Sequence, residues 1–201
     1  LRQTASKLDS LNRMLPWGSN TFIVPNTHQY DQWGMLERFP LHLAFSDEEE
    51  QYGLAALRDM GVEAGAPFVC FYARDGVYIS RHQPRMVSLV GEWDENEFRN
   101  ADIKTYFPAV EELVGSGYYA LRAGKWTKDT MEHDNHMVID YPNRHHSDFM
   151  DIFLSARCAF FIGTNGGIMN PPSIFRRPMA QANVIPLVDV VNGCADTVSI
   201  P

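Results

Sequence analysis

The feature that most constrains the fold is a short apolar run near the middle of the chain. Residues 68–74 read FVCFYAR, with Pro67 before the run and the turn pair Asp75-Gly76 after it. A continuous apolar run of this length, bounded by turn residues, is typical of a strand that is buried on both faces. Such strands occur in parallel sheets whose two faces are covered by helices. The run therefore predicts a central strand of a parallel sheet.

Helical and strand-like segments alternate along the chain from Ser46 onward. Ser46 and Glu49 have the spacing of a capping box, which predicts a helix from Asp47 to Met60 that ends at Gly61. Further helices are expected at 103–114, 148–156 and 168–175. Further strands are expected at 118–121, 136–140, 159–162 and 182–187. This alternation predicts an α/β fold, a Rossmann-like parallel sheet flanked by helices with right-handed crossovers.

Composition excludes several classes of function. The formal net charge is -8 and the pI is near 5.3, so the chain lacks the basic footprint that binds nucleic acid. No run approaches the ~18 apolar residues of a transmembrane helix, and no signal peptide is recognisable. Cys70 and Cys158 lie within apolar runs, and Cys194 is the third cysteine. Buried free thiols are therefore expected, which suits a reducing cytoplasm.

Polar residues follow the ends of the predicted strands. The first strand is followed by Arg74, Asp75 and Gly76, and the second by Arg122 and Gly124. In an open parallel sheet, ligands bind outside the carboxyl ends of the strands. Two arginines at neighbouring strand ends suit a diphosphate, because a guanidinium group holds phosphate oxygens in a bidentate fork.

The fourth predicted strand leads into the turn Gly163-Thr164-Asn165-Gly166-Gly167. Because the turn connects a strand to a helix, its backbone N–H groups can face an anion, and glycine lets a phosphate approach closely. Thr164 and Asn165 add side-chain donors. Such turns also occur for conformational reasons alone, but the neighbouring arginines favour phosphate binding. The turn is neither G-x-G-x-x-G nor a P-loop, which argues against a dinucleotide site or an ATPase.

Five segments then occur in a characteristic order. They are FRNADI (98–103), GYYALRAG (117–124), SDFMDI (147–152), FIGTNGG (161–167) and IFRRP (174–178). The series resembles a family of predicted bacterial glycosyltransferases found with surface-polysaccharide genes. It is similar, more distantly, to the nucleotide-binding half of GT-B enzymes such as heptosyltransferases and UDP-sugar 2-epimerases. The resemblance spans about residues 46 to 190.

This resemblance implies a metal-independent sugar transferase that binds its nucleotide-sugar donor in the C-terminal half of a GT-B fold. The acceptor would be a glycan or a lipid-linked hydroxyl compound. Residues 1–45 are expected to be a linker or the tail of an N-terminal acceptor domain, and residues 46–201 a donor-binding domain that is incomplete at its C-terminus. In fucosyltransferase-like relatives an arginine after the first strand contacts the donor diphosphate, and Arg74 matches it. A cytoplasmic location is expected, with peripheral attachment to the inner membrane left open.

The expected reaction is an inverting transfer that needs no cofactor. Arg74, Arg122 and the turn at 164–167 would stabilise the charge that develops on the leaving diphosphate. Asp75 is a candidate general base, although Asp-Gly is also an ordinary turn pair.

Two further polar residues and two other functions remain open. Arg99 and Asp102 precede a predicted helix, where they would contact the donor or where Asp102 would act as an N-cap. The histidines at 133, 136, 145 and 146 match no zinc-binding spacing. A sugar-nucleotide epimerase would use the same fold and phosphate turn. A non-catalytic nucleotide-sugar-binding module would keep the sheet without the chemistry.

Overall fold

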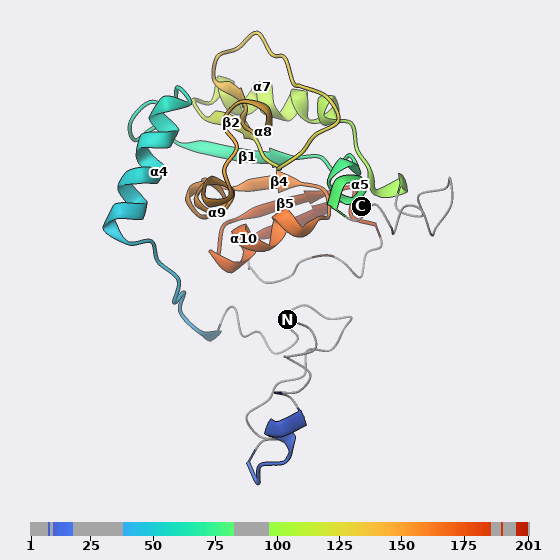
Figure 1. Ribbon diagram of the computed structural model, residues 1–201. Coiled ribbons are helices and arrows are strands. Elements are labelled where there is room, and N and C mark those ends of the chain that lie inside the picture. Colours follow the sequence, from blue (N-terminus) through green and yellow to red (C-terminus); the bar gives the residue numbers. More distant parts are fainter. Residues whose placement is uncertain are drawn as a thin grey trace.

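The computed structural model describes residues 8, 10–17, 38–82, 97–185, 190 and 196–200. Within these residues, six parallel strands form one sheet in the order β3-β2-β1-β4-β5-β6 (Figure 1). The strands are β1 Phe68–Tyr72, β2 Tyr119–Arg122, β3 Val138–Asp140, β4 Phe161–Gly163, β5 Met179–Ala182 and β6 Thr197–Ile200. This is the order of a doubly wound sheet, and it confirms the predicted Rossmann-like α/β class.

Helices connect and cover the strands. The α-helices are α4 Asp47–Asp59, α5 Val77–His82, α7 Phe107–Gly115, α8 Tyr141–Arg144, α9 Asp148–Arg157 and α10 Asn170–Ile174. The 3₁₀ helices are η1 Glu97–Arg99, η2 Ile103–Tyr106 and η3 Gly167–Met169. The predicted capping box of α4 is present, because the Ser46 hydroxyl accepts a hydrogen bond from the Glu49 N–H and the Glu49 carboxylate accepts one from the Ser46 N–H.

Successive residues of β1 face opposite sides of the sheet and belong to two separate cores. Phe68 and Cys70 pack in the core formed with α4 and α9, whereas Val69 and Phe71 pack with Val110 of α7. Figure 1 shows α9 and α10 on one side of the sheet and α7 on the other. Burial on both faces explains why the strand is apolar at every position.

Several boundaries differ from the sequence-based expectation. The helix expected at 103–114 is divided into η2 and α7. Pro108 has no N–H to donate to the carbonyl of Lys104, so a continuous α-helix would leave that carbonyl unpaired. The strand expected at 182–187 lies earlier, at Met179–Ala182, and ends where Asn183 adopts a φ of 54°. Helix α5 and strand β6 were not predicted.

The structure bears on two further predictions, the state of the cysteines and the boundary between the two expected regions of the chain. Cys70 and Cys158 are buried free thiols, as predicted, whereas Cys194 lies outside the described residues. Phe45 stacks on Phe175, with the ring centroids 5.7 Å apart. Ordered packing against the core thus includes the residue just before the expected boundary at 45/46, and that boundary stays a prediction.

Candidate functional site

A cavity of about 660 Å³ lies at the carboxyl edge of the sheet. Its lining comes from residues between 72 and 78 after β1, residues 124–126 after β2, the first turns of α9, and residues between 166 and 171 after β4. Strands β1 and β4 are adjacent in the sheet although they are far apart in sequence, so the chain reverses its winding direction between them. Ligands of open α/β sheets bind at this kind of switch point. The volume is in the range of cofactor and ligand pockets.

Arg74 joins three segments at one end of this cavity. Its backbone N–H donates to the Thr164 hydroxyl at 2.9 Å, and its guanidinium Nη1 donates to Asn100 Oδ1 at 2.6 Å. The side chain is buried and still lines the cavity. Arg99, the last residue of η1, lines the same cavity. The cavity lining therefore carries two permanent positive charges, which is the electrostatic environment a phosphate group requires.

The glycine turn after β4 packs closely against β1. A Cβ atom at Gly163 would lie 3.0 Å from the carbonyl oxygen of Tyr72, and one at Gly166 would lie 3.1 Å from the Tyr72 ring. Thr164 is fully buried, and its hydroxyl holds the Arg74 backbone. Gly166 and Gly167 line the cavity, whereas Gly163 and Thr164 attach the turn to the sheet. The close approach explains Gly163 and Gly166 independently of any ligand, whereas a Cβ atom at Gly167 would meet no atom within 4 Å.

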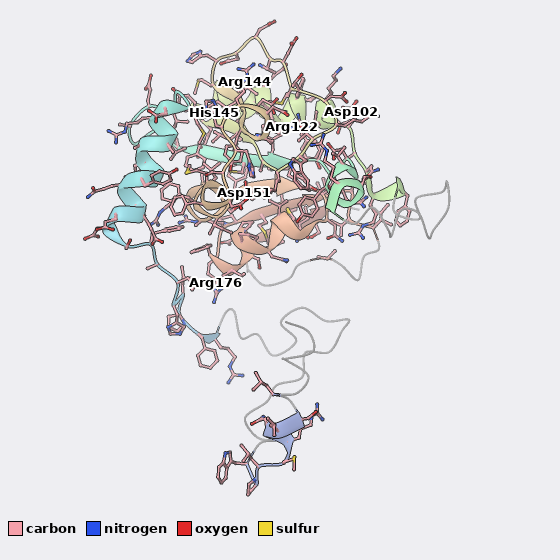
Figure 2. All side chains as sticks on the ribbon, viewed as in Figure 1. Asp102, Arg122, Arg144, His145, Asp151 and Arg176 are labelled. Carbon is pink, nitrogen blue, oxygen red and sulfur yellow. The ribbon has the colours of Figure 1, made fainter. Side chains whose placement is uncertain are left out.

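Arg122 lies elsewhere. It is buried, and its Nη1 donates to the Asp129 carbonyl at 2.8 Å and lies 3.4 Å from Asp140 Oδ1. It lines a second cavity of about 810 Å³, which Asp102 also lines, on the α7 side of the sheet. Figure 2 shows Arg122 and Asp102 on that side and Asp151 on α9. The predicted convergence of Arg74 and Arg122 on one diphosphate therefore does not occur, although Arg122 ends β2 and Arg74 follows the neighbouring β1.

The reason is the pleat of the sheet. Arg122 pairs in register with Phe71, and Phe71 faces the α7 side. Arg74 lies beyond the end of β1, where the backbone has left the strand. Gly124, two residues after Arg122, does line the first cavity. Its φ of 131° is a conformation that favours glycine.

Both predicted acidic residues serve local structure. Asp75 Oδ1 accepts from the Val77 N–H at 3.1 Å, and Asp75 Oδ2 accepts from the Lys128 N–H at 2.7 Å. Asp75 thus starts α5 and holds the loop after β2. Asp102 is the N-cap of η2, with Oδ1 accepting from the Lys104 N–H at 2.9 Å.

The cavity lining also contains residues that the sequence reasoning missed. Tyr78 and Trp126 lie with ring centroids 5.5 Å apart, and the Lys125 ammonium lies 5.7 Å from the Trp126 ring. Lys125 Nζ also donates to Asp148 Oδ1 at 2.6 Å. Lys125 and Trp126 directly follow Gly124 at a strand end, and that position was the available signal. Tyr78 could not be found in this way, because α5 was not predicted.

A cluster of potential metal ligands includes two residues of the cavity lining, Asp148 and Asp151. His146, Asp148 and Asp151 each place one ligand atom within 4.8 Å of the others. Tyr141 donates to Asp151 Oδ1 at 2.8 Å, and His146 Nε2 lies 3.1 Å from Asp151 Oδ2. Burial raises the pKa of Asp151, whereas the hydrogen bond from Lys125 lowers the pKa of Asp148. The carboxylates thus already have hydrogen-bonding partners, and the metal-independence of the reaction stays a prediction.

Comparison with known proteins supports the fold. The chain matches no protein-family model and no curated protein. Among solved structures it is similar to the E. coli ADP-heptose lps heptosyltransferase II, with a TM-score of 0.56 and 13% sequence identity. The match covers 79% of this chain and 44% of the heptosyltransferase. The chain therefore has a glycosyltransferase-like fold and spans less than half the length of that structure.

Within the described ranges, no helix combines the length and the apolar character needed to cross a membrane.

Proposed function

We propose that this chain binds a nucleotide-diphosphate sugar in the cavity at the β1/β4 switch point and takes part in transfer of the sugar to a hydroxyl acceptor. The observation that carries the proposal is the joint placement of Arg74, Arg99 and the glycine turn in the lining of one ligand-sized cavity. The similarity to a heptosyltransferase structure supports the fold on which the proposal rests. A role in surface-polysaccharide synthesis follows from the sequence resemblance alone.

The diphosphate would lie against Arg74, Arg99 and the backbone of Gly166 and Gly167. When the bond between the anomeric carbon and the phosphate oxygen breaks, negative charge develops on the diphosphate leaving group. Fixed guanidinium groups and backbone N–H donors stabilise that charge without reorganising. This charge stabilisation makes a metal-independent, inverting transfer feasible, in which the acceptor oxygen attacks from the opposite face of the sugar.

Two of the predicted residues take different roles in this proposal. Asp75 positions the loop after β2 through the Lys128 N–H and is not proposed as the base. Arg122 stabilises the neighbouring loops through Asp140 and is not proposed as a phosphate ligand.

The test is calorimetric titration with ADP, GDP, UDP and CDP in the presence of a chelator. We expect one nucleotide to bind, and Arg74→Lys and Arg99→Ala each to weaken its binding ~10-fold, about 1.4 kcal/mol. Arg74→Lys keeps a charge but loses the planar fork that reaches Asn100 and a phosphate together. Arg58→Ala is the matched control, because Arg58 lies on α4 and donates to the Leu54 carbonyl of its own helix.

Failure of all four nucleotides to bind would refute the proposal. Equal weakening by Arg58→Ala would show that the titration reports net charge rather than the site. Incubation of a bound nucleotide sugar without acceptor separates the reaction classes, because an epimerase would convert the donor to an isomer and a transferase would not.

A further inference from the structure

The second cavity, of about 810 Å³, lies on the α7 side of the same carboxyl edge of the sheet. Its lining comes from five segments, namely residues 73–75 after β1, residues 100–104, Phe107 of α7, Arg122 at the end of β2, and residues 128–132. Asp75 lines both cavities, so the two adjoin at this residue. Diphosphate binding in the first cavity leaves this second volume without an assigned ligand.

The loop at 128–132, which forms one wall of the second cavity, is fixed by a buried ion pair. Arg122 Nη1 donates to the Asp129 carbonyl at 2.8 Å. Asp140 Oδ2, on the other member of the pair, accepts from the Met131 N–H at 2.8 Å. A buried ion pair is weak evidence for stability in itself, because desolvation offsets the attraction between the charges. These contacts give the pair a second effect, which is to hold the loop backbone in one position.

The polar side chains on this fixed backbone remain available to a ligand. Lys128, Asp129 and Glu132 are exposed and line the cavity. Within the part of the chain that the structure describes, none of these three side chains has a hydrogen-bonding or ion-pairing partner. A backbone that is already ordered loses less conformational entropy when a ligand binds to it.

The charges and polarity of the lining restrict the class of ligand. The lining contains the carboxylates of Asp75, Asp102, Asp129 and Glu132 and the ammonium groups of Lys104 and Lys128. The charge of Arg122 is balanced by Asp140. The excess of negative charge disfavours phosphate and other anions. Nine of the fourteen lining residues are polar or charged, which disfavours an acyl chain.

A neutral saccharide meets both restrictions. Each sugar hydroxyl donates and accepts hydrogen bonds, so it pairs with carboxylates and with ammonium groups, and the lining offers both. The half-buried ring of Phe107, in the same lining, is an apolar surface for the C–H face of a sugar ring. We propose that the second cavity binds a neutral saccharide, which is the hydroxyl acceptor of the transfer. The acceptor assignment rests on the proposed function, because it places this saccharide beside the donor cavity.

Saturation-transfer difference NMR on the full chain tests the site with four probes, maltose, cellobiose, lactose and N,N′-diacetylchitobiose. We expect at least one to bind, and Asp129→Ala and Glu132→Ala each to weaken it ~10-fold, because each removes a charged hydrogen-bond acceptor. Asp134→Ala is the matched control, since Asp134 is an exposed carboxylate close by in the chain that does not line the cavity. Putrescine, a small dication, tests whether the acidic excess binds a cation instead.

The same titration with saturating nucleoside diphosphate tests the acceptor assignment. We expect the saccharide to stay bound when the nucleotide is present, because the two occupy different cavities. Arg74→Lys, which should weaken nucleotide binding, should leave saccharide binding unchanged. Competition between saccharide and nucleotide would show that they share one site, and the inference would be wrong.

The remaining outcomes separate this inference from the proposed function. If no saccharide binds, or if only putrescine binds, the inference is wrong while the donor site stands. If Asp134→Ala weakens saccharide binding as much as Asp129→Ala, the titration reports net charge and the inference is again wrong. If a saccharide binds in the second cavity but no nucleotide binds to the protein, the proposed function fails and the acceptor assignment fails with it.

Discussion

Removing the carboxylate of Asp140 should destabilise the fold strongly. Asp140 is 2% exposed and ends β3. Its Oδ1 pairs with Arg122, and its Oδ2 accepts from the Met131 N–H at 2.8 Å and from Asn143 Nδ2 at 2.7 Å. One buried carboxylate thus connects the end of β2, the following loop and α8. Asp140→Ala removes all three contacts at once.

The size of the expected destabilisation follows from the Arg122 charge and the Met131 N–H, which both stay buried after the substitution. Arg122 is 4% exposed, so after the substitution its charge is buried with the Asp129 carbonyl as its remaining hydrogen-bond acceptor among the described residues. Breaking a buried ion pair by removing one partner costs about 3–5 kcal/mol. Loss of the acceptor for the buried Met131 N–H costs about 1–3 kcal/mol, and the two contributions overlap. We expect Asp140→Ala to lower the free energy of unfolding by about 4 kcal/mol, a large part of the 5–15 kcal/mol typical of a domain.

Urea unfolding followed by circular dichroism measures this change. Glu50→Ala is the control, because the Glu50–Arg157 pair is partly exposed and should contribute less than about 1 kcal/mol. The double variant Arg122→Met with Asp140→Ala should be more stable than the sum of the single changes predicts, since no charge is left buried. A loss below about 1 kcal/mol for Asp140→Ala would refute the reasoning. Unchanged stability together with weaker nucleotide binding in Arg122→Met would also refute the reasoning, because Arg122 would then be a ligand-binding residue.

Three further changes test the packing of the helices and of a buried hydroxyl. Gly53→Ala should destabilise the protein by about 1–3 kcal/mol in urea unfolding, because the new methyl group would overlap the buried ring of Phe153. Gly115→Ala, with no atom near the added methyl, should be neutral or stabilising by up to about 1 kcal/mol. Tyr106→Phe should keep or raise stability at neutral pH, since among the described residues the buried hydroxyl of Tyr106 has no hydrogen-bond partner. Burial raises the pKa of Tyr106 to about 12, so folding favours the protonated phenol. The stability that comes from this preference for the protonated phenol is complete below about pH 10 and is lost as the pH rises through 12. The alkaline unfolding profile of Tyr106→Phe should lack this loss of stability.

Sequence reasoning located the elements whose signals are local. The capping box at Ser46 and Glu49 identified α4, and Ser147 was correctly placed at the start of α9, where its hydroxyl accepts from the Met150 N–H. The apolar run at 68–72 identified the central strand. Helix α5 was missed because its sequence, VYISRH, has no N-cap signal of its own. Its start is instead held by the carboxylate of Asp75.

In the candidate site, too, sequence reasoning found the residues with local signals and missed the contacts between distant segments. Arg74, Asp75, Arg99 and the glycines at 124, 166 and 167 were predicted from strand ends and from the family resemblance, and all of them line the cavity. Strand ends could not show on which side of the sheet Arg122 would lie. That depends on the register between β1 and β2 and on an acidic partner 18 residues away along the chain.

The sequence by itself determined the α/β class, the central strand and the turn that follows β4, because hydrophobic period, capping residues and glycine act over a few neighbouring residues. Only the tertiary structure decided which charges meet. Arg74 reaches the cavity because Thr164 and Asn100, on two other segments, hold it there. Arg122 does not reach this cavity, because Asp140 pairs with it inside the protein. Electrostatic partnerships depend on distances between segments remote in sequence, and packing of the whole sheet sets those distances.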